Sequence, residues 1–361
     1  MCPKLNTYYN MFCIGFLFIA LIFLYFSIGN SDKNKIFKFL FIFICVYFAG
    51  LRDGLGQDYA SYLEDMHERN FDFNLNLSIL IYEPSFFILY VIIQNTGLSP
   101  YAYFLIMSIL TIIPILLFFY KNENSYWSIF FFLTLSGFGY WQSFNLIRQF
   151  AAIALFCISL KYLYEEKYRY YYIFIFLSML FHFSAILLFF LPLIKKIHFH
   201  NKTFPILIIV ISFFTKYIGF TIPSWMAMGY GRYEMLMDSD QQDNTSTIYL
   251  VLSILLIFTI LLKDKVIKSE IRELFLKLGL LCILFCNLAW SSVLFMRFSL
   301  YFAPALFIAL TYPIYYKKIS IYYKSSIFIV FLFVRIYDLY QNQSIPQIVS
   351  TKILPLSIIF D

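Results

Sequence analysis

Residues 101–120 read YAYFLIMSILTIIPILLFFY, a run of 20 residues without a charged side chain. About 20 mostly apolar residues are enough for a helix that crosses the hydrocarbon core of a bilayer. The whole chain is similar in character, because 61% of its 361 residues are hydrophobic and only 13% are charged. Soluble domains carry about 25% charged residues. The composition therefore excludes a water-soluble globule and predicts an all-α polytopic integral membrane protein.

Apolar runs separated by short polar segments continue on both sides of this stretch. They predict about 10–12 transmembrane helices, and they leave no room for a separate soluble domain. We therefore expect a single transmembrane domain over residues 1–361. The candidate helices lie near residues 8–28, 36–50, 80–96, 101–120, 126–141, 145–163, 170–192, 204–222, 248–262, 275–296, 298–316 and 325–340.

The charges between the runs predict the sidedness of the loops. Residues 51–79 carry six acidic side chains against two arginines, and residues 223–247 carry four against one. Residues 194–203, 263–277 and 315–324 are instead rich in lysine. Because basic loops stay in the cytoplasm, the two acidic loops are expected outside and the basic loops inside. The net charge of +7 is explained by this orientation, and no nucleic-acid partner is expected.

Several familiar chemistries have no motif in the sequence. The six cysteines form no CxxC pair and read as small buried hydrophobic residues, so neither disulfides nor a metal site are expected. Phosphate-binding glycine loops, HExxH, GxSxG and dinucleotide fingerprints are all absent. We expect no cofactor.

Ionisable side chains near the spans are the functional candidates, since each costs several kcal/mol at membrane depth unless it is paired or hydrated. The first group lies in LRDGLGQDYASY, residues 51–62. Arg52 offers a planar fork for phosphate, and Asp58 and Tyr62 would share one face of a helix beginning there. We expect these three residues to form an outward-facing cluster with Glu83. The alternative is a solvated loop with Arg52 at the lipid headgroups.

Four further candidates lie later in the chain. Glu83 precedes Pro84, where a carboxylate also favours the start of a helix. Arg148 leads into small residues that permit close approach of a ligand, although an arginine at a helix end can also anchor the helix. His182 lies about twelve residues into its predicted span and must hydrogen-bond either a helix or a substrate. Arg297 divides two apolar stretches and fits either anion binding or anchoring.

Four segments together resemble the EpsG-like family of Wzy-type polysaccharide polymerases. They are residues 52–62 with Gly56-Gln57-Asp58-Tyr59, residues 83–89 beginning Glu83-Pro84, residues 147–152 with Ile147-Arg148-Gln149, and Phe181-His182-Phe183-Ser184-Ala185. Gln57 and Ser85 stand where the family usually has threonine and glycine. The second half of the chain matches in hydropathy, in its acidic loop and in Arg297 to Tyr301.

The resemblance implies an O-antigen or capsule polymerase in the bacterial inner (cytoplasmic) membrane. Such an enzyme is a glycosyltransferase that joins undecaprenyl diphosphate-linked glycans at the outer side of the membrane. The reaction needs a general base and positive donors for the departing diphosphate. Asp58, Glu83 or His182 fit the first role, and the diphosphate or substrate contacts fall to Arg52, Tyr59, Tyr62, Arg148 and Arg297. The implied partners are membrane lipids, a chain-length regulator and a flippase.

Two other functions are compatible with the same residues. A flippase or transporter of lipid-linked oligosaccharide would line its pathway with buried arginine and histidine. An O-antigen ligase would use the same donor with a lipid A-core acceptor. Large acidic external loops favour the enzyme, whereas clear internal repeats would favour the transporter.

Overall fold

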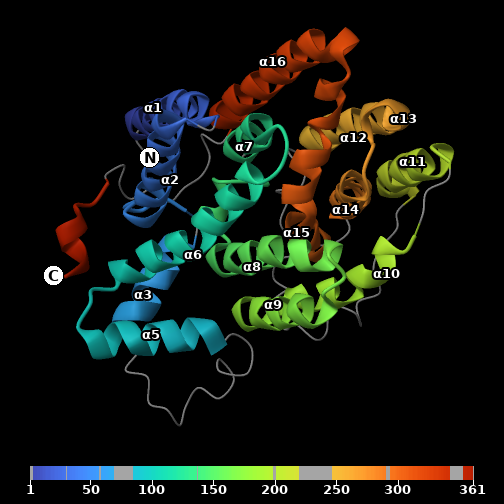
Figure 1. Cartoon of the computed structure of the whole chain (residues 1–361). Helices are drawn as coiled ribbons and strands as arrows, with labels where there is room; N and C mark the ends of the chain where they lie inside the picture. The colour runs from blue at the N-terminus through green and yellow to red at the C-terminus, as the bar shows by residue number, and fades with distance from the viewer. Residues whose placement is uncertain are drawn as a thin grey trace. The chain divides into compact units, whose positions relative to one another are not determined.

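The computed structural model describes residues 3–29, 31–56, 58–68, 84–135, 137–197, 201–218, 246–289, 293–341 and 353–360. Every regular element in these ranges is a helix, and the extended pairing within them is one isolated bridge between Arg52 and Ile353 (Figure 1). The predicted all-α fold is confirmed.

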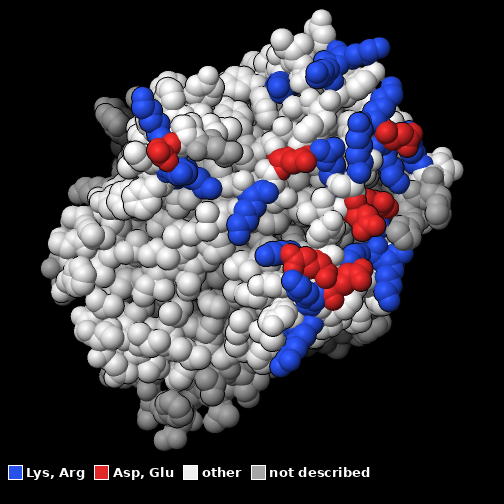
Figure 2. All heavy atoms as spheres, viewed as in Figure 1, with Lys and Arg blue, Asp and Glu red and all other residues white. Residues whose placement is uncertain are grey.

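Three of the described helical segments are long and apolar enough to cross a membrane: Tyr101–Tyr120, Ile147–Tyr164 and Leu294–Tyr315. Seven shorter apolar segments accompany them. Large apolar side chains also lie on the outside of the protein, and Phe39 and Phe333 are each 67% exposed. Figure 2 shows broad areas of this surface without a charge. Because such a surface needs an apolar environment, the chain is a multi-pass membrane protein.

The chain divides into two compact units, residues 1–186 with 331–361 and residues 187–330. The predicted single transmembrane domain stays a prediction. The first unit contains most of the candidate site residues. Its helices are α1 (Pro3–Ser27), α2 (Asp32–Gly50), α3 (Tyr59–Glu68), α5 (Pro84–Thr96), α6 (Tyr101–Tyr120), α7 (Ser125–Thr134), α8 (Ile147–Tyr164) and α9 (Tyr168–Phe181), with the short η1 (Gln142–Phe144) and η9 (Leu356–Ile359).

Small residues let the helices of the first unit approach closely. A side chain at Gly50 would collide with Leu105 and Ser108 of α6, and the Ser108 hydroxyl donates a hydrogen bond of 3.2 Å to the carbonyl of Val46 in α2. Between α8 and α9, Ser178 donates to the carbonyl of Ala152 at 2.8 Å. These contacts join the helices whose ends carry the candidate residues (Figure 1).

The second unit contains α10 (Leu191–Lys195), α11 (Thr203–Ile218), α12 (Ser246–Leu261), α13 (Lys263–Val266), α14 (Glu270–Leu288) and α15 (Val293–Ala309). The η2 turn (Phe183–Phe190) and α16 (Lys317–Gln341) each cross a boundary between the units.

In this unit, the three segments that are predicted to lie in the cytoplasm touch one another. Lys202 pairs with Asp264, Lys277 donates to the carbonyl of Lys195 at 3.1 Å, and Arg272 lies 4.1 Å from the ring centre of Tyr315. They therefore lie on one side of the membrane.

Four predicted helices end early: those over 275–296 and 298–316 end at Leu288 and Ala309, and the other two end early for local reasons that the structure shows. The helix predicted over 126–141 ends at Thr134, because the chain turns back until the amide of Tyr140 donates to the carbonyl of Phe132 at 2.8 Å. Gly139 permits this turn, since a Cβ there would lie 2.0 Å from that carbonyl oxygen. The helix predicted over 170–192 ends at Phe181, and His182 is extended with φ −156° and ψ 118°.

The structure describes the two predicted acidic loops to different extents. Of residues 51–79 the structure describes 51–56 and 58–68, which contain α3, and the predicted position of this segment outside the cytoplasm stays a prediction. The segment 223–247 lies outside the described residues except for its last two, which begin α12.

Candidate functional site

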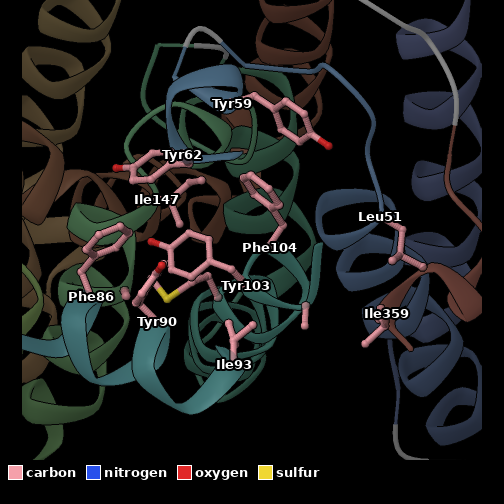
Figure 3. Packing of buried hydrophobic residues seen from close by; sticks show 13 residues of the cluster. Leu51, Tyr59, Tyr62, Phe86, Tyr90, Ile93, Tyr103, Phe104, Ile147 and Ile359 are labelled. Atoms are coloured by element: carbon pink, nitrogen blue, oxygen red, sulfur yellow. The ribbon is translucent and has the colours of Figure 1, made fainter. Parts of the chain in front are cut away.

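Residues from all four family-like segments lie around one aromatic cluster in the first unit (Figure 3). The buried members are Leu51, Tyr59, Tyr62, Phe86, Tyr90, Ile93, Ala102, Tyr103, Phe104, Met107, Ile147, Ala151 and Ile359, and Phe181 packs against them. The rings of Tyr62, Phe86 and Tyr103 are mutual neighbours, with centres 5.6 to 6.0 Å apart. Segments that are far apart in the sequence therefore pack together in one aromatic cluster.

Arg148 is a charged residue that is held at this aromatic cluster. Its Nε donates a hydrogen bond of 2.9 Å to the hydroxyl of Tyr62. The guanidinium carbon lies 5.2 Å from the ring centre of Tyr62 and 5.3 Å from that of Phe86. Because one nitrogen and both ring contacts fix the guanidinium plane, the side chain is preorganised to bind two oxygens of a carboxylate or phosphate group.

The backbone around Arg148 adds to the positive potential. Arg148 lies in the first turn of α8, and Leu146 at the N-cap supplies no side-chain hydrogen bond. The first amides of a helix lack intrahelical acceptors and carry the positive end of the helix dipole. An anion beside Arg148 would therefore meet both a cation and backbone donors.

Arg52 points into the protein instead. The side chain is only 3% exposed, and it donates to the carbonyls of Leu55 at 2.8 Å, Phe144 at 3.2 Å and Ala49. Burial lowers the pKa of Arg52 to about 10, so the guanidinium stays charged at neutral pH. Its contacts join the end of α2 to the turn before α8. The guanidinium thus lies inside the protein, and the predicted contact of Arg52 with a diphosphate stays a prediction.

Gly56 allows the loop that contains Arg52 to lie close to the turn before α8. Its φ of +117° is rarely adopted by other residues, and a Cβ there would lie 2.9 Å from the carbonyl oxygen of Phe144. The loop before α3 therefore packs directly on the turn that leads into α8. Tyr59 continues this contact, because its buried ring stacks on Phe104 at 4.5 Å.

His182 lies at the break between α9 and η2. Its Nδ1 is 2.6 Å from the hydroxyl oxygen of Ser184. Across the break, Ser85 in the first turn of α5 donates to the carbonyl of Leu180 at 2.7 Å, which satisfies a group at the end of α9. Irregular backbone at membrane depth is tolerated where protein or a cavity surrounds it. The predicted continuous helix through His182 is wrong, because α9 ends at Phe181, while the depth of His182 in the membrane and its candidate role stay predictions.

The other predicted site residues are placed only in part. Asp58 is exposed just before α3. Glu83 lies outside the described residues. Arg297 lies half-buried in α15 of the second unit. Tyr62 and Arg148 are brought together, whereas the expected cluster of Arg52 with Asp58, Tyr62 and Glu83 stays a prediction. Among the described residues, no three metal-binding side chains come together.

Two contacts of the candidate residues were not predicted from the sequence. Phe86 provides a ring for Arg148, and Ser184 contacts His182. Both residues lie within the family-like segments, so the segments themselves are the signal that points to them. Ser85, which stands where the family usually has glycine, uses its hydroxyl to hold the end of α9.

A comparison with known protein families identifies the family of the chain. A model of the EpsG family matches residues 35–357, nearly the whole chain. No curated protein and no solved structure gave a significant match. The match includes every candidate residue named above. The chain therefore belongs to the EpsG family, and at the level of that family it is a membrane protein of the polysaccharide-polymerase type.

Proposed function

We propose that this protein polymerises undecaprenyl diphosphate-linked oligosaccharide repeat units at the outer side of the bacterial inner membrane, as in O-antigen or capsule synthesis. The observation that carries the proposal is Arg148 at the start of α8, held by Tyr62 and Phe86. Membership of the EpsG family supports the reaction type.

In the proposed reaction a hydroxyl of the incoming repeat unit attacks the anomeric carbon of the growing chain. The bond from that carbon to the diphosphate oxygen breaks, a glycosidic bond forms, and the hydroxyl proton passes to a base. The lipid diphosphate departs with the electron pair. Stabilising the charge that develops on the diphosphate and removing the proton are the two tasks of the protein.

Arg148 is assigned to the diphosphate. A guanidinium can grip two phosphate oxygens at once, and contacts with Tyr62 and Phe86 hold the guanidinium of Arg148 in place. The amides at the start of α8 would bind the same anion. Tyr62 orients Arg148, and Arg297 remains a candidate for a second diphosphate contact.

The proton acceptor remains one of three residues, Asp58, Glu83 and His182. Arg52 and Tyr59 support the loop that precedes Asp58. In this proposal a flippase supplies the repeat units, and a chain-length regulator and membrane lipids are the other partners.

The banding pattern of surface polysaccharide in a deletion strain tests the proposal. If the protein is a polymerase, the strain makes a single capped repeat unit and complementation restores the ladder. Loss of all O-antigen would instead indicate a ligase or a flippase. Purified protein in proteoliposomes with undecaprenyl diphosphate-linked repeat units should form polymer, and failure to do so would contradict the proposal directly.

A further inference from the structure

The segment 353–360, here termed the clasp segment, crosses the loop that contains Arg52. Ile353 forms an antiparallel bridge with Arg52, and the amide of Leu354 donates to the carbonyl of Leu51 at 2.8 Å. Pro355 has no amide hydrogen and ends this pairing. The clasp segment thus adds a short extended strand to the loop, as peptides do when they bind to exposed backbone.

The second half of the clasp segment holds a different part of the first unit. After Pro355 the chain forms η9, and the carbonyl of Ile359 accepts a hydrogen bond of 2.9 Å from the amide of Ser99. The Ser99 hydroxyl also bonds to the carbonyl of Ile358. Ser99 lies in the turn between α5 and α6. The clasp segment therefore ties this turn to the end of α2.

Ile359 connects the clasp segment to the candidate site. Its side chain is 6% exposed and belongs to the aromatic cluster with Tyr62 and Phe86, and Figure 3 shows it beside Leu51 at one edge of that cluster. The neighbouring side chain of Phe360 is 73% exposed. Ile359 is thus part of the aromatic cluster, whereas the adjacent Phe360 lies outside it.

We propose that the clasp segment is a positioning element of the polymerase site. It holds the loop at residues 51–56 and the turn at Ser99. The stretch of chain between these two points contains α3 and α5, which place Tyr62 and Phe86 beside Arg148. This inference rests on the proposed function for its effect on activity, but the fixing of the two backbone segments is testable without it.

The first test compares adjacent residues. Ile359→Ser is expected to lower polymer formation in proteoliposomes about tenfold or more, because a buried apolar contact is lost. Phe360→Ser, the matched control, is expected to stay within about twofold of the wild type. Equal rates for the two variants would overturn the proposal.

The second test needs no enzymatic activity and remains informative if Ile359→Ser folds poorly. Protein ending at residue 352 is compared with the full chain by hydrogen exchange, alone and with the synthetic peptide ILPLSIIFD. The proposal expects faster exchange at Ser99 and throughout residues 51–62 without the segment, and recovery with the peptide. Recovery should fail with the peptide carrying Ile359→Ser. A change confined to Ser99, or none, would overturn the positioning role.

Both readouts separate this inference from the proposed function. If the wild-type protein forms no polymer but the exchange pattern follows the peptide, the polymerase proposal fails while the clasp segment still fixes the loop. If the wild-type protein forms polymer and the exchange pattern ignores the peptide, the clasp proposal alone fails.

Discussion

The Nε of Arg148 donates a hydrogen bond of 2.9 Å to the hydroxyl of Tyr62, which lies 86 residues earlier in the chain. The same guanidinium rests against the rings of Tyr62 and Phe86. These contacts join the start of α8 to α3 and α5. Residues from three segments that are far apart in the sequence therefore orient the guanidinium of Arg148. The consequences for rate and stability can be measured separately.

Tyr62→Phe keeps the ring but removes the hydrogen-bond acceptor for Arg148. We expect the rate of polymer formation to fall about fivefold, the equivalent of roughly 1 kcal/mol for one hydrogen bond. Tyr322→Phe is the control, because Tyr322 is 73% exposed. Initial rates in proteoliposomes provide the measurement. Equal rates for the Tyr62 variant and the wild type would show that the hydroxyl does not orient Arg148.

Arg52→Lys should affect stability rather than chemistry. A lysine cannot reproduce the planar fork that serves three carbonyls, and each buried group left unsatisfied costs about 1–3 kcal/mol. We expect lower membrane abundance and a lower melting temperature in detergent. Arg169→Lys, at an exposed position, serves as the control. A fully stable Arg52→Lys protein with no activity would instead place Arg52 in contact with substrate.

Gly56→Ala should loosen the junction between the Arg52 loop and the turn before α8. The new Cβ would lie 2.9 Å from the Phe144 carbonyl at a φ of +117°, and strain of this kind costs about 1–3 kcal/mol. Gly137→Ala is a suitable control because nothing lies within 4 Å of its added Cβ. Melting temperatures should separate the two variants. A Gly56→Ala protein as stable as Gly137→Ala would disprove the close packing.

Ser184→Ala removes the hydroxyl that lies 2.6 Å from Nδ1 of His182. If His182 takes part in the reaction, a less fixed ring should lower the rate about fivefold, at roughly 1 kcal/mol for one hydrogen bond. Ser184→Thr retains a hydroxyl and should recover most of the rate. The proteoliposome assay distinguishes these variants, and an alanine variant as active as wild type would argue against dependence on this contact.

The fold was predictable wherever an apolar run was long and uninterrupted. The run at 101–120 forms α6 over Tyr101–Tyr120, because no local contact competes with the helix. The run at 170–192 was not predictable in the same way. It is also long and mostly apolar, yet the helix breaks at His182, where Ser184 contacts the ring and Ser85 bonds to the end of α9. Apolar character alone does not reveal such contacts.

Candidate site residues could be named from the sequence, but their arrangement could not be predicted. Arg148 and Tyr62 were both candidates, yet their hydrogen bond depends on the packing of α3 against α5 and α8. The inward direction of Arg52 depends on the Phe144 carbonyl, a backbone group that has no signature in the sequence. Pairing of Ile353 with Arg52 likewise joins segments without a shared motif.

The central claim is that Arg148 stabilises a departing diphosphate. Lysine keeps the charge but loses the planar fork that grips two oxygens, whereas an anchoring role would survive this change. We expect Arg148→Lys to lose about 2–4 kcal/mol of transition-state stabilisation, which corresponds to a rate about 30-fold to 900-fold lower.

The most direct measurement is the polysaccharide ladder of a deletion strain complemented with wild type, Arg148→Lys or Arg148→Ala at matched membrane abundance. The account predicts a full ladder for the wild type and a shortened or absent ladder for both variants. A normal ladder from Arg148→Lys would contradict the claim that the guanidinium fork holds the diphosphate, and a normal ladder from Arg148→Ala would exclude any role of this residue in the reaction.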